Sequence, residues 1–350
     1  MPRSIRSGPT AVPPGRRRRA RRASLLAALA LAGPGSAWAS AAGPAEDPAV
    51  RAFMAEMVAE HGFAPQALES LFRATVFSQQ VLDAFARPAE SKPWHEYRRI
   101  FLTPTRIERG VAFWQAHAEV LARASERYGI PPEVIVAIIG VETLYGARTG
   151  SIRVLDALTT LAFRYPRRAR FFRRELIAYL LLAREEGLDP GGLTGSYAGA
   201  IGVPQFIPTS YRAYAIDFDS DGTRDLLGSV SDAIGSVANY LGRHGWRQGA
   251  PIAVPATVAG RAPPALLERG LEPSIPAGEL TASGVALAAA VPASELVALL
   301  ELDLEAGAVE HWAGFRNFYA LTRYNPSKLY AMAVFQLAGE IRLARAGRGN

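Results

Sequence analysis

The segment at residues 131–146, PPEVIVAIIGVETLYG, is almost wholly apolar and starts with two prolines. Proline is tolerated in the first turn of a helix, and glycine commonly follows the last one. The segment therefore predicts a helix that opens at the proline pair and closes at Gly146. Because it is so strongly apolar, we expect it to be the buried, central helix of the fold.

Glu142 interrupts this apolar segment. Ile135, Ile138 and Ile139 precede it by seven, four and three positions, a spacing that places all four residues on one helix face. A carboxylate on a buried face is costly, and desolvation favours its protonated form near neutral pH, as a general acid requires. A core glutamate satisfied by an arginine or by helix N-termini would show the same spacing, so periodicity alone leaves both interpretations open.

Most of the remaining sequence has helical periodicity. Apolar residues three and four positions apart predict helices from Asp47 to about Tyr128, and others at 155–163, 167–186 and 230–243. Between Pro251 and about Pro292, short Val, Ala and Leu runs broken by Pro and Gly predict a small β-rich insertion. Helical or mixed sequence resumes near residue 310.

The first residues have the order of a secretory signal peptide. An arginine cluster precedes an apolar run at Leu25 to Ala32 and the small-residue triplet Ala37-Trp38-Ala39, so cleavage is expected near Ser40. The pair Arg21-Arg22 leaves export by the twin-arginine route open. The sequence predicts a periplasmic protein.

Composition narrows the range of partners. Residues 1–39 hold eight arginines and no acid, so their removal leaves 31 basic and 32 acidic residues and changes the net charge from +7 to −1. A nucleic-acid partner then has no compositional support. The chain has no cysteine, which excludes disulfides and a lipidated-cysteine anchor. We expect a monomer without a membrane anchor.

Four motifs occur in order along the chain: GVETLYG, LDALTTLAFRYPRRARFF, GSYAGAIGVPQFIPTSYRAYAIDFDSDG and DAIGSVANYLGRHGW. From about Trp94 to Val334 the sequence closely resembles the membrane-bound lytic murein transglycosylase B family. The resemblance implies a mainly α (α+β) fold, in which a lysozyme-like core carries extra helices and a small inserted β subdomain. We accordingly expect a signal peptide at 1–39, an N-terminal helical region at 40–128, a catalytic core with a calcium-type loop at 129–249, a β-rich subdomain at 250–310, and a C-terminal segment at 311–350 that completes the core.

The same resemblance assigns the active site. It makes Glu142 the catalytic acid. Aromatic rings can pack on sugar faces while tyrosine hydroxyls form hydrogen bonds, which agrees with the substrate contacts it implies. Any one tyrosine could instead belong to the core, and the arginine pair could be a solvated helix start. The substrate contacts are Ser196, Gln205, Tyr240, Arg167, Arg168, Tyr324, Asn325, Tyr330 and, as a weaker match, Tyr97.

An acidic loop follows the third motif. Asp217, Asp219, Asp221 and Gly222 reproduce the first half of an EF-hand calcium loop, but position twelve is Gly228 where a glutamate is normal. The family has a longer loop closed at the start of the next helix, which implies Asp232 here. The backbone carbonyl of Thr223 would be a further ligand, and Asp225 an extra one. We expect a structural calcium ion and no catalytic cofactor, with a solvated acidic turn as the alternative.

The resemblance implies a reaction as well. Glu142 would act as acid and then base to cleave the bond between N-acetylmuramic acid and N-acetylglucosamine of peptidoglycan without water, leaving 1,6-anhydro ends. Partners would be glycan strands and other cell-wall enzymes. A lysozyme-like hydrolase would need a second carboxylate, such as Asp156. The remaining alternative is a non-catalytic glycan-binding protein of the envelope.

Overall fold

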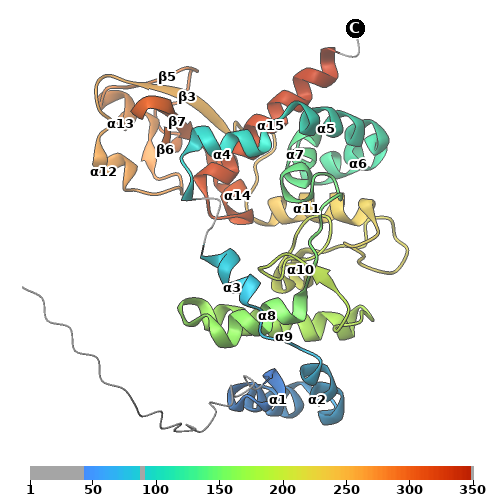
Figure 1. The fold of residues 1–350 in the computed structure, drawn as a ribbon. Coiled ribbons are helices and arrows are strands. Elements are labelled where there is room, and N and C mark those ends of the chain that lie inside the picture. Colours follow the sequence, from blue (N-terminus) through green and yellow to red (C-terminus); the bar gives the residue numbers. More distant parts are fainter. Residues whose placement is uncertain (1–42, 87–90, 348–350) are drawn as a thin grey trace, which may run out of the picture. The chain divides into compact units, whose positions relative to one another are not determined.

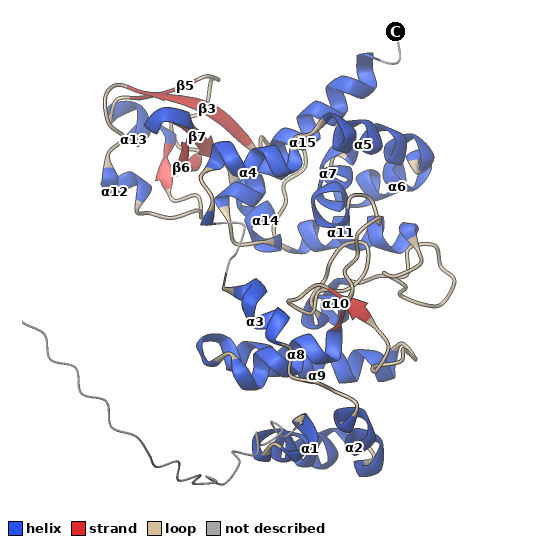
Figure 2. Cartoon of the chain, viewed as in Figure 1, coloured by secondary structure: helices blue, strands red, loops and turns tan. Residues whose placement is uncertain are grey.

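Helices dominate residues 43–86 and 91–347, which are the part of the chain that the computed structural model describes (Figures 1 and 2). The expected signal peptide at 1–39 lies outside these residues. The helices are α1 (Pro48–His61), α2 (Pro65–Arg73), α3 (Gln79–Phe85), α4 (Trp94–Phe101), α5 (Pro104–Ala116), α6 (Ala118–Tyr128), α7 (Pro132–Thr143), α8 (Val154–Arg164), α9 (Ala169–Glu185), α10 (Pro208–Tyr214), α11 (Val230–Arg243), α12 (Pro264–Leu267), α13 (Ala277–Ala282), α14 (Arg316–Tyr324) and α15 (Lys328–Gly347).

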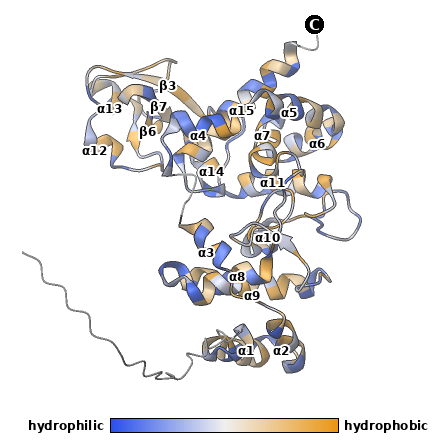
Figure 3. Ribbon diagram, viewed as in Figure 1, coloured by the Kyte–Doolittle hydropathy of each residue, from blue (hydrophilic) through white to orange (hydrophobic). Residues whose placement is uncertain are grey.

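Helix α7 is the buried centre of the helical part, as its sequence predicts. Every residue from Val134 to Val141 is buried, whichever side of the helix it occupies. Figure 3 shows the hydropathy of the same segment. The helix packs against α5, α6, α11 and α15. A helix that is apolar on all sides is stable only when other parts of the protein cover its whole surface.

The end of α7 differs from the prediction. The helix stops at Thr143 rather than at Gly146, because Leu144 and Tyr145 already adopt left-handed backbone angles, with φ of 51° and 62°. Such angles are uncommon for residues with a side chain, so apolar periodicity does not signal them. The chain therefore turns directly after Glu142 and Thr143.

A five-stranded antiparallel sheet follows the helical part of the sequence (Figure 2). Its order is β4-β6-β7-β3-β5, and two short helices, α12 and α13, connect its strands. The strands are β3 (Ala253–Val258), β4 (Ile275–Pro276), β5 (Val285–Leu287), β6 (Leu296–Asp303) and β7 (Val309–Gly314).

Strand β7 extends the sheet beyond the predicted β-rich insertion, which was expected to end near Pro292, into the segment expected to be helical or mixed. Its residues pair with β6 on one side and β3 on the other, so that Trp312 faces both Leu300 and Pro255. The strand is thus specified by partners on both sides more than by its own sequence pattern.

A second, two-stranded sheet was not predicted. In it β1 (Ile152–Arg153) pairs with β2 (Thr194–Gly195). A Cβ on Gly150 would lie only 2.0 Å from the carbonyl oxygen of Gly195, so glycine is required where these two segments meet. This pairing attaches the GSYAG motif to the start of α8. Within residues 43–86 and 91–347, no helix has the length and apolar character needed to cross a membrane.

Candidate active site

Glu142 lies at the point where the buried helix α7 reaches the surface. It is half-exposed, whereas its neighbours Val141 and Thr143 are buried. Glu142 is therefore partly buried, at the end of a helix whose residues Val134 to Val141 are all buried. The Tyr330 hydroxyl donates a hydrogen bond of 2.6 Å to Oε1 of Glu142.

Tyr330 belongs to the first turn of α15 and is 2% exposed. Burial raises the pKa of its hydroxyl well above the ordinary value, and the nearby Glu142 charge raises it further. The hydroxyl therefore stays protonated at neutral pH and can serve as a permanent donor to the carboxylate.

An aromatic cluster, defined as Phe206, Tyr240, Tyr324 and Tyr330, adjoins Glu142. The rings of Tyr324 and Tyr330 are parallel, with centroids 6.2 Å apart, and Tyr240 meets Tyr324 edge-on at 4.9 Å. Phe206 contacts both Tyr240 and Tyr324. The hydroxyl of Tyr324 donates to the Pro204 carbonyl and that of Tyr240 to the Arg323 carbonyl, each at 2.5 Å, so both rings are held in place.

The loop from Ser196 to Phe206 carries part of this cluster. The Ser196 Oγ accepts the amide hydrogens of Ala198 and Ala200, at 3.2 and 3.0 Å. The Gln205 side-chain amide donates to the carbonyls of Thr149 and Gly202, at 3.0 and 2.9 Å. Both predicted contact residues thus shape the loop.

Sequence reasoning missed Thr143, the residue after Glu142. Its hydroxyl donates to the Val203 carbonyl at 2.8 Å, which joins the end of α7 to the loop that carries Phe206. It also accepts the Gly146 amide at 3.0 Å. Its place beside Glu142 in the GVETLYG motif was the only sequence signal for it.

The helix predicted at 167–186 begins at Ala169 in the structure, so the two predicted arginines lie before α9. Arg167 and Arg168 are exposed in a short 3₁₀ turn (Pro166–Arg168) before α9. The Arg168 guanidinium lies 4.3 Å from the ring of Phe171. Edge-on ring contacts at 5.4 and 5.3 Å lead from Phe172 through Phe85 to Tyr197, the neighbour of Ser196.

Two further predicted residues have different environments. Tyr97 is buried in α4, a helix that packs against α15, and its ring contacts Trp94 and Phe101. Asn325 is the residue directly after α14, and it lines a pocket of about 610 Å³. The other lining residues are Ser91, Lys92, Pro93, Asp303, Pro326, Ser327, Lys328 and Leu329.

The carboxylates of Asp217, Asp219 and Asp221 lie together in the acidic loop, with one oxygen of each within 4.8 Å of the others. Asp217 accepts the amides of Asp221 and Gly222, and Asp221 accepts both the amide and the hydroxyl of Thr223. Three converging hard oxygen donors fit a calcium ion.

Asp232 and Asp225 hold the shape of this loop. Asp232 is fully buried, and its two oxygens accept the amides of Phe218 and Asp225, at 2.7 and 2.8 Å. Burial raises the pKa of the Asp232 carboxyl. Asp225 accepts the amides of Leu227 and Gly228. Asp232 is not one of the three carboxylates whose oxygens converge, and its role as a calcium ligand stays a prediction.

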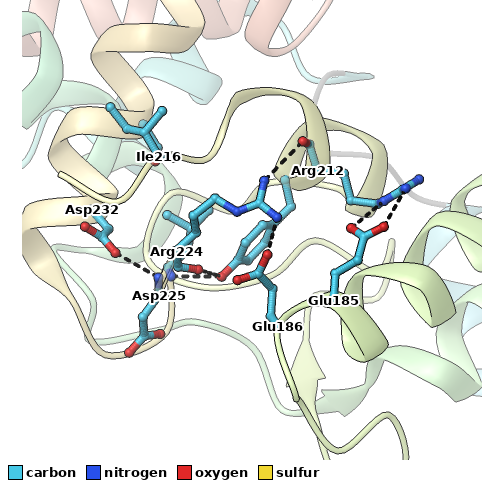
Figure 4. Close-up of polar contacts among 10 residues, drawn as sticks. Glu185, Glu186, Arg212, Ile216, Arg224, Asp225 and Asp232 are labelled. Carbon is cyan, nitrogen blue, oxygen red and sulfur yellow. Dashed lines mark hydrogen bonds and ion pairs between the residues drawn. The ribbon is translucent and has the colours of Figure 1, made fainter. Parts of the chain in front are cut away.

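Ion pairs brace the same loop from the other side (Figure 4). Arg224 pairs with Glu186 and donates to the Arg212 carbonyl, while Arg212 pairs with Glu185. The hydroxyl of Tyr211 donates to the Arg224 carbonyl and accepts the Leu226 amide. The acidic loop is therefore attached to the end of α9 and to α10.

Comparison with known proteins identifies the family. Residues 45–339 match the transglycosylase SLT domain. This chain belongs to that family. It is 44% identical over 311 residues to membrane-bound lytic murein transglycosylase B of Escherichia coli (strain K12), covering 86% of this chain and 84% of the relative.

Solved structures with a similar fold are also lytic transglycosylases. The lytic transglycosylase SltB1 of Pseudomonas aeruginosa is 51% identical, with a TM-score of 0.81 over 86% of this chain and 99% of that one. Escherichia coli lytic transglycosylase Slt35 in complex with calcium is 42% identical, with a TM-score of 0.79 over 86% and 95%. SltB3 of Pseudomonas aeruginosa in complex with NAG-anhNAM-pentapeptide is 33% identical, with a TM-score of 0.71 over 83% and 78%.

Family membership settles the class of protein. The resemblance, the mainly helical lysozyme-like fold and the enzyme class, a peptidoglycan lytic transglycosylase, are confirmed. Of the predicted site residues, the structure brings Glu142, Tyr330, Tyr324 and Tyr240 together. The roles of individual residues remain predictions.

Proposed function

We propose that this protein cleaves the bond between N-acetylmuramic acid and N-acetylglucosamine of peptidoglycan without water, and that Glu142 is its one acid and base. The observation that carries the proposal is the 2.6 Å hydrogen bond from the permanently protonated Tyr330 hydroxyl to Glu142, at the half-exposed end of a buried helix. The complex of the related SltB3 with an anhydro-muramyl pentapeptide supports the product class.

The first step breaks the glycosidic bond. Glu142 gives its proton to the bridging oxygen, the bond from the muramic acid anomeric carbon to that oxygen breaks, and N-acetylglucosamine leaves with a hydroxyl. The muramic acid's own N-acetyl oxygen stabilises the positive charge at the anomeric carbon.

The second step closes a ring. The Glu142 carboxylate takes the proton of the 6-hydroxyl of the same muramic acid, whose oxygen then bonds to the anomeric carbon. The carboxyl group is restored and a 1,6-anhydro sugar leaves. The nucleophile belongs to the bound ring, so its attack has the advantage of an intramolecular reaction.

The environment of Asp156 supports a reaction with one carboxyl group. A hydrolase of the ordinary type uses two. Asp156 is 6% exposed; it pairs with Arg153 at 2.8 Å and accepts the Val76 amide at 3.0 Å. Through these contacts Asp156 attaches the segment before α3 to α8, so its carboxylate is already engaged within the protein.

The proposed substrate contacts follow from the aromatic cluster and its neighbours. Tyr324 is partly exposed and its hydroxyl is anchored, which suits packing of its ring against a sugar. Tyr240 is 7% exposed and stacks on His244, so its proposed contact with the strand is limited to that small exposed part. Ser196, Gln205, Asn325 and the exposed guanidinium groups of Arg167 and Arg168 offer polar groups for hydroxyl, N-acetyl and carboxylate groups of the strand. Tyr97 would contribute by supporting Tyr330 from within the core.

For the acidic loop we propose a structural calcium ion held by Asp217, Asp219 and Asp221. The Thr223 carbonyl and Asp232, which also braces the loop, would be further ligands. The bound ion would stabilise the turn and take no part in the reaction. The calcium complex of the related Slt35 supports this proposal. Calorimetric titration with calcium should give one site in the wild type and none in Asp219→Asn; heat in neither protein would contradict it.

We also propose that the protein works in the periplasm after its signal peptide is removed, on glycan strands and alongside other cell-wall enzymes. The murein enzymes among its relatives support the compartment. N-terminal sequencing of the exported protein should begin near Ser40.

The reaction is tested by mass spectrometry of products released from purified peptidoglycan. Wild type should give muropeptides lighter by one water than hydrolytic fragments, and Glu142→Gln should give none. Glu133→Gln, at the opposite end of α7, is the matched control and should retain activity. Full-mass reducing fragments from the wild type, or full activity of Glu142→Gln, would contradict the proposal.

A further inference from the structure

The turn that follows Glu142 is strained. Leu144, Tyr145 and Gly146 have consecutive positive φ angles of 51°, 62° and 83°, and the first two carry side chains. Left-handed backbone is costly for such residues and persists only where surrounding contacts enforce it. Backbone bonds from the amides of Leu144 and Tyr145 to the Gly140 and Ile139 carbonyls close the turn on the helix itself.

The Tyr145 side chain supplies contacts from outside that helix. Its hydroxyl donates to the Arg106 carbonyl in α5 at 2.8 Å, and burial raises the pKa of this hydroxyl well above the ordinary range. Its ring lies 5.5 Å from that of Phe113. The residue is therefore a partly buried donor anchored to a different helix.

Two glycines make room for this ring. A Cβ added to Gly140 in α7 would lie 2.5 Å from the Tyr145 hydroxyl oxygen, and one added to Gly110 in α5 would lie 2.6 Å from the same atom. Real Cβ atoms essentially never come this close to another heavy atom. Tyr145 thus occupies a slot that α5 and α7 form by both having glycine at the crossing.

Arg106 completes the connection. Its Nε donates to the Gly140 carbonyl at 3.0 Å, two residues before Glu142, and its Nη1 donates to the Ile100 carbonyl at the end of α4. Burial lowers the pKa of this guanidinium. A cation is favourable near the C-terminal end of a helix, where carbonyl oxygens concentrate negative charge.

We infer that Arg106 and Tyr145 form a lock that sets the position of Glu142 during the reaction. The lock holds the last turn of α7 from one side through the Gly140 carbonyl and the strained turn from the other through the Tyr145 hydroxyl. Arg106 and Tyr145 are positioning residues that act through Glu142. The inference rests on the proposed role of Glu142.

Tyr145→Phe removes only the hydroxyl and is the first test. We expect kcat to fall about tenfold while KM stays within about twofold, since small displacements of a catalytic group affect the chemical step. The matched control is Tyr179→Phe, which removes another buried tyrosine bond to a carbonyl, to Pro190, also of 2.8 Å. Both variants should lose similar thermal stability, and only Tyr145→Phe should lose kcat.

Arg106 gives a second test that does not depend on the first variant. Arg106→Met should lower kcat with KM little changed, and Arg106→Lys, which keeps a charged donor, should recover part of the loss. In the double variant with Tyr145→Phe, the effects on kcat should be less than multiplicative, because both residues serve one lock.

The outcomes separate this inference from the proposed function. If kcat of Tyr145→Phe matches that of Tyr179→Phe, or if the Arg106 variants change only stability, the lock is wrong while Glu142 can still be the acid. If Glu142→Gln keeps its activity, the proposed function fails, and a lock for that residue fails with it.

Discussion

The hydrogen bond between Tyr330 and Glu142 joins residues 188 positions apart in the chain. An oxygen of a carboxyl group accepts a hydrogen bond in both protonation states, so this contact is compatible with Glu142 as acid and as base. Here the donor is fixed by burial and by its parallel contact with Tyr324. One oxygen of the carboxyl group consequently has a defined direction before any substrate binds.

Tyr330→Phe tests whether this direction matters. The variant keeps the ring but removes the donor, so we expect kcat to fall about tenfold or more, within the range of effects of general acid catalysis. Unfolding should become easier by about 1 kcal/mol, the typical value of a hydrogen bond. Tyr319→Phe, in the neighbouring helix α14, is the control. Steady-state kinetics with glycan strands measure both, and unchanged kcat in Tyr330→Phe would contradict an orienting role.

Sequence reasoning found the residues of this site better than their contacts. The motif resemblance pointed to Glu142, Tyr324 and Tyr330, which the structure brings together. Their mutual distances and the exposure of Glu142 depend on how α15 packs against α7. Local periodicity in the sequence does not predict that packing. Thr143, Arg106 and Tyr145 were missed for the same reason.

At the level of elements, the prediction held where an element is specified by its own sequence. Helix α11 begins at Val230 as expected, with Ser229 as its cap, because the side chain of Ser229 accepts the amide of Asp232. The prediction failed where other segments decide the conformation. The end of α7 and strand β7 are both determined by contacts with distant residues.

Helices α9 and α10 are joined by a buried carboxyl group. Glu175 is 2% exposed, and its two oxygens accept the amide and the hydroxyl of Thr209 at 2.9 and 2.8 Å. Since Thr209 follows the loop that carries Phe206, this contact supports the candidate site through α10. Burial is the largest influence on the carboxyl group and raises its pKa from the ordinary value of 4.5.

The raised pKa of Glu175 predicts a pH-dependent stability. The folded state holds this proton more tightly than the unfolded state, so the contribution of Glu175 is complete below pH 4.5 and is lost as pH rises through the folded pKa. Relative to Glu175→Gln, which keeps the shape, the wild type should therefore be most stable at acid pH and lose that advantage toward neutrality. Thermal unfolding of both proteins across this range measures the difference.

Glu56 provides a control of opposite sign. The hydrogen bond from Arg173 holds its pKa below the ordinary value, so its contribution is present above that value and is lost as pH falls. Glu56→Gln should accordingly cost stability near neutral pH and little in acid. If both variants change stability in the same direction across this pH range, at least one of the two carboxyl groups does not titrate as its surroundings require.

For the whole molecule, strand β6 is an element that contributes buried residues to both hydrophobic clusters. Ala298, Leu300 and Leu302 belong to the main core with the helices, whereas Val297 and Leu299 belong to a second cluster within the sheet. Alternate residues of a strand point to opposite faces, so one strand forms a wall of both clusters. The described residues belong to a single compact unit, and a subdomain at 250–310 remains a prediction about sequence organisation.

This sharing predicts that the sheet and the helical core unfold together. Scanning calorimetry of the mature protein should show one transition. Val297→Ala, which leaves a cavity in the sheet cluster, should destabilise the whole molecule by about 1 to 3 kcal/mol and shift that transition without splitting it. Ile138→Ala in α7 should shift the same transition, because both substitutions act on one cooperative unit. A second peak that moves with Val297→Ala but not with Ile138→Ala would instead show that the sheet folds as an independent domain.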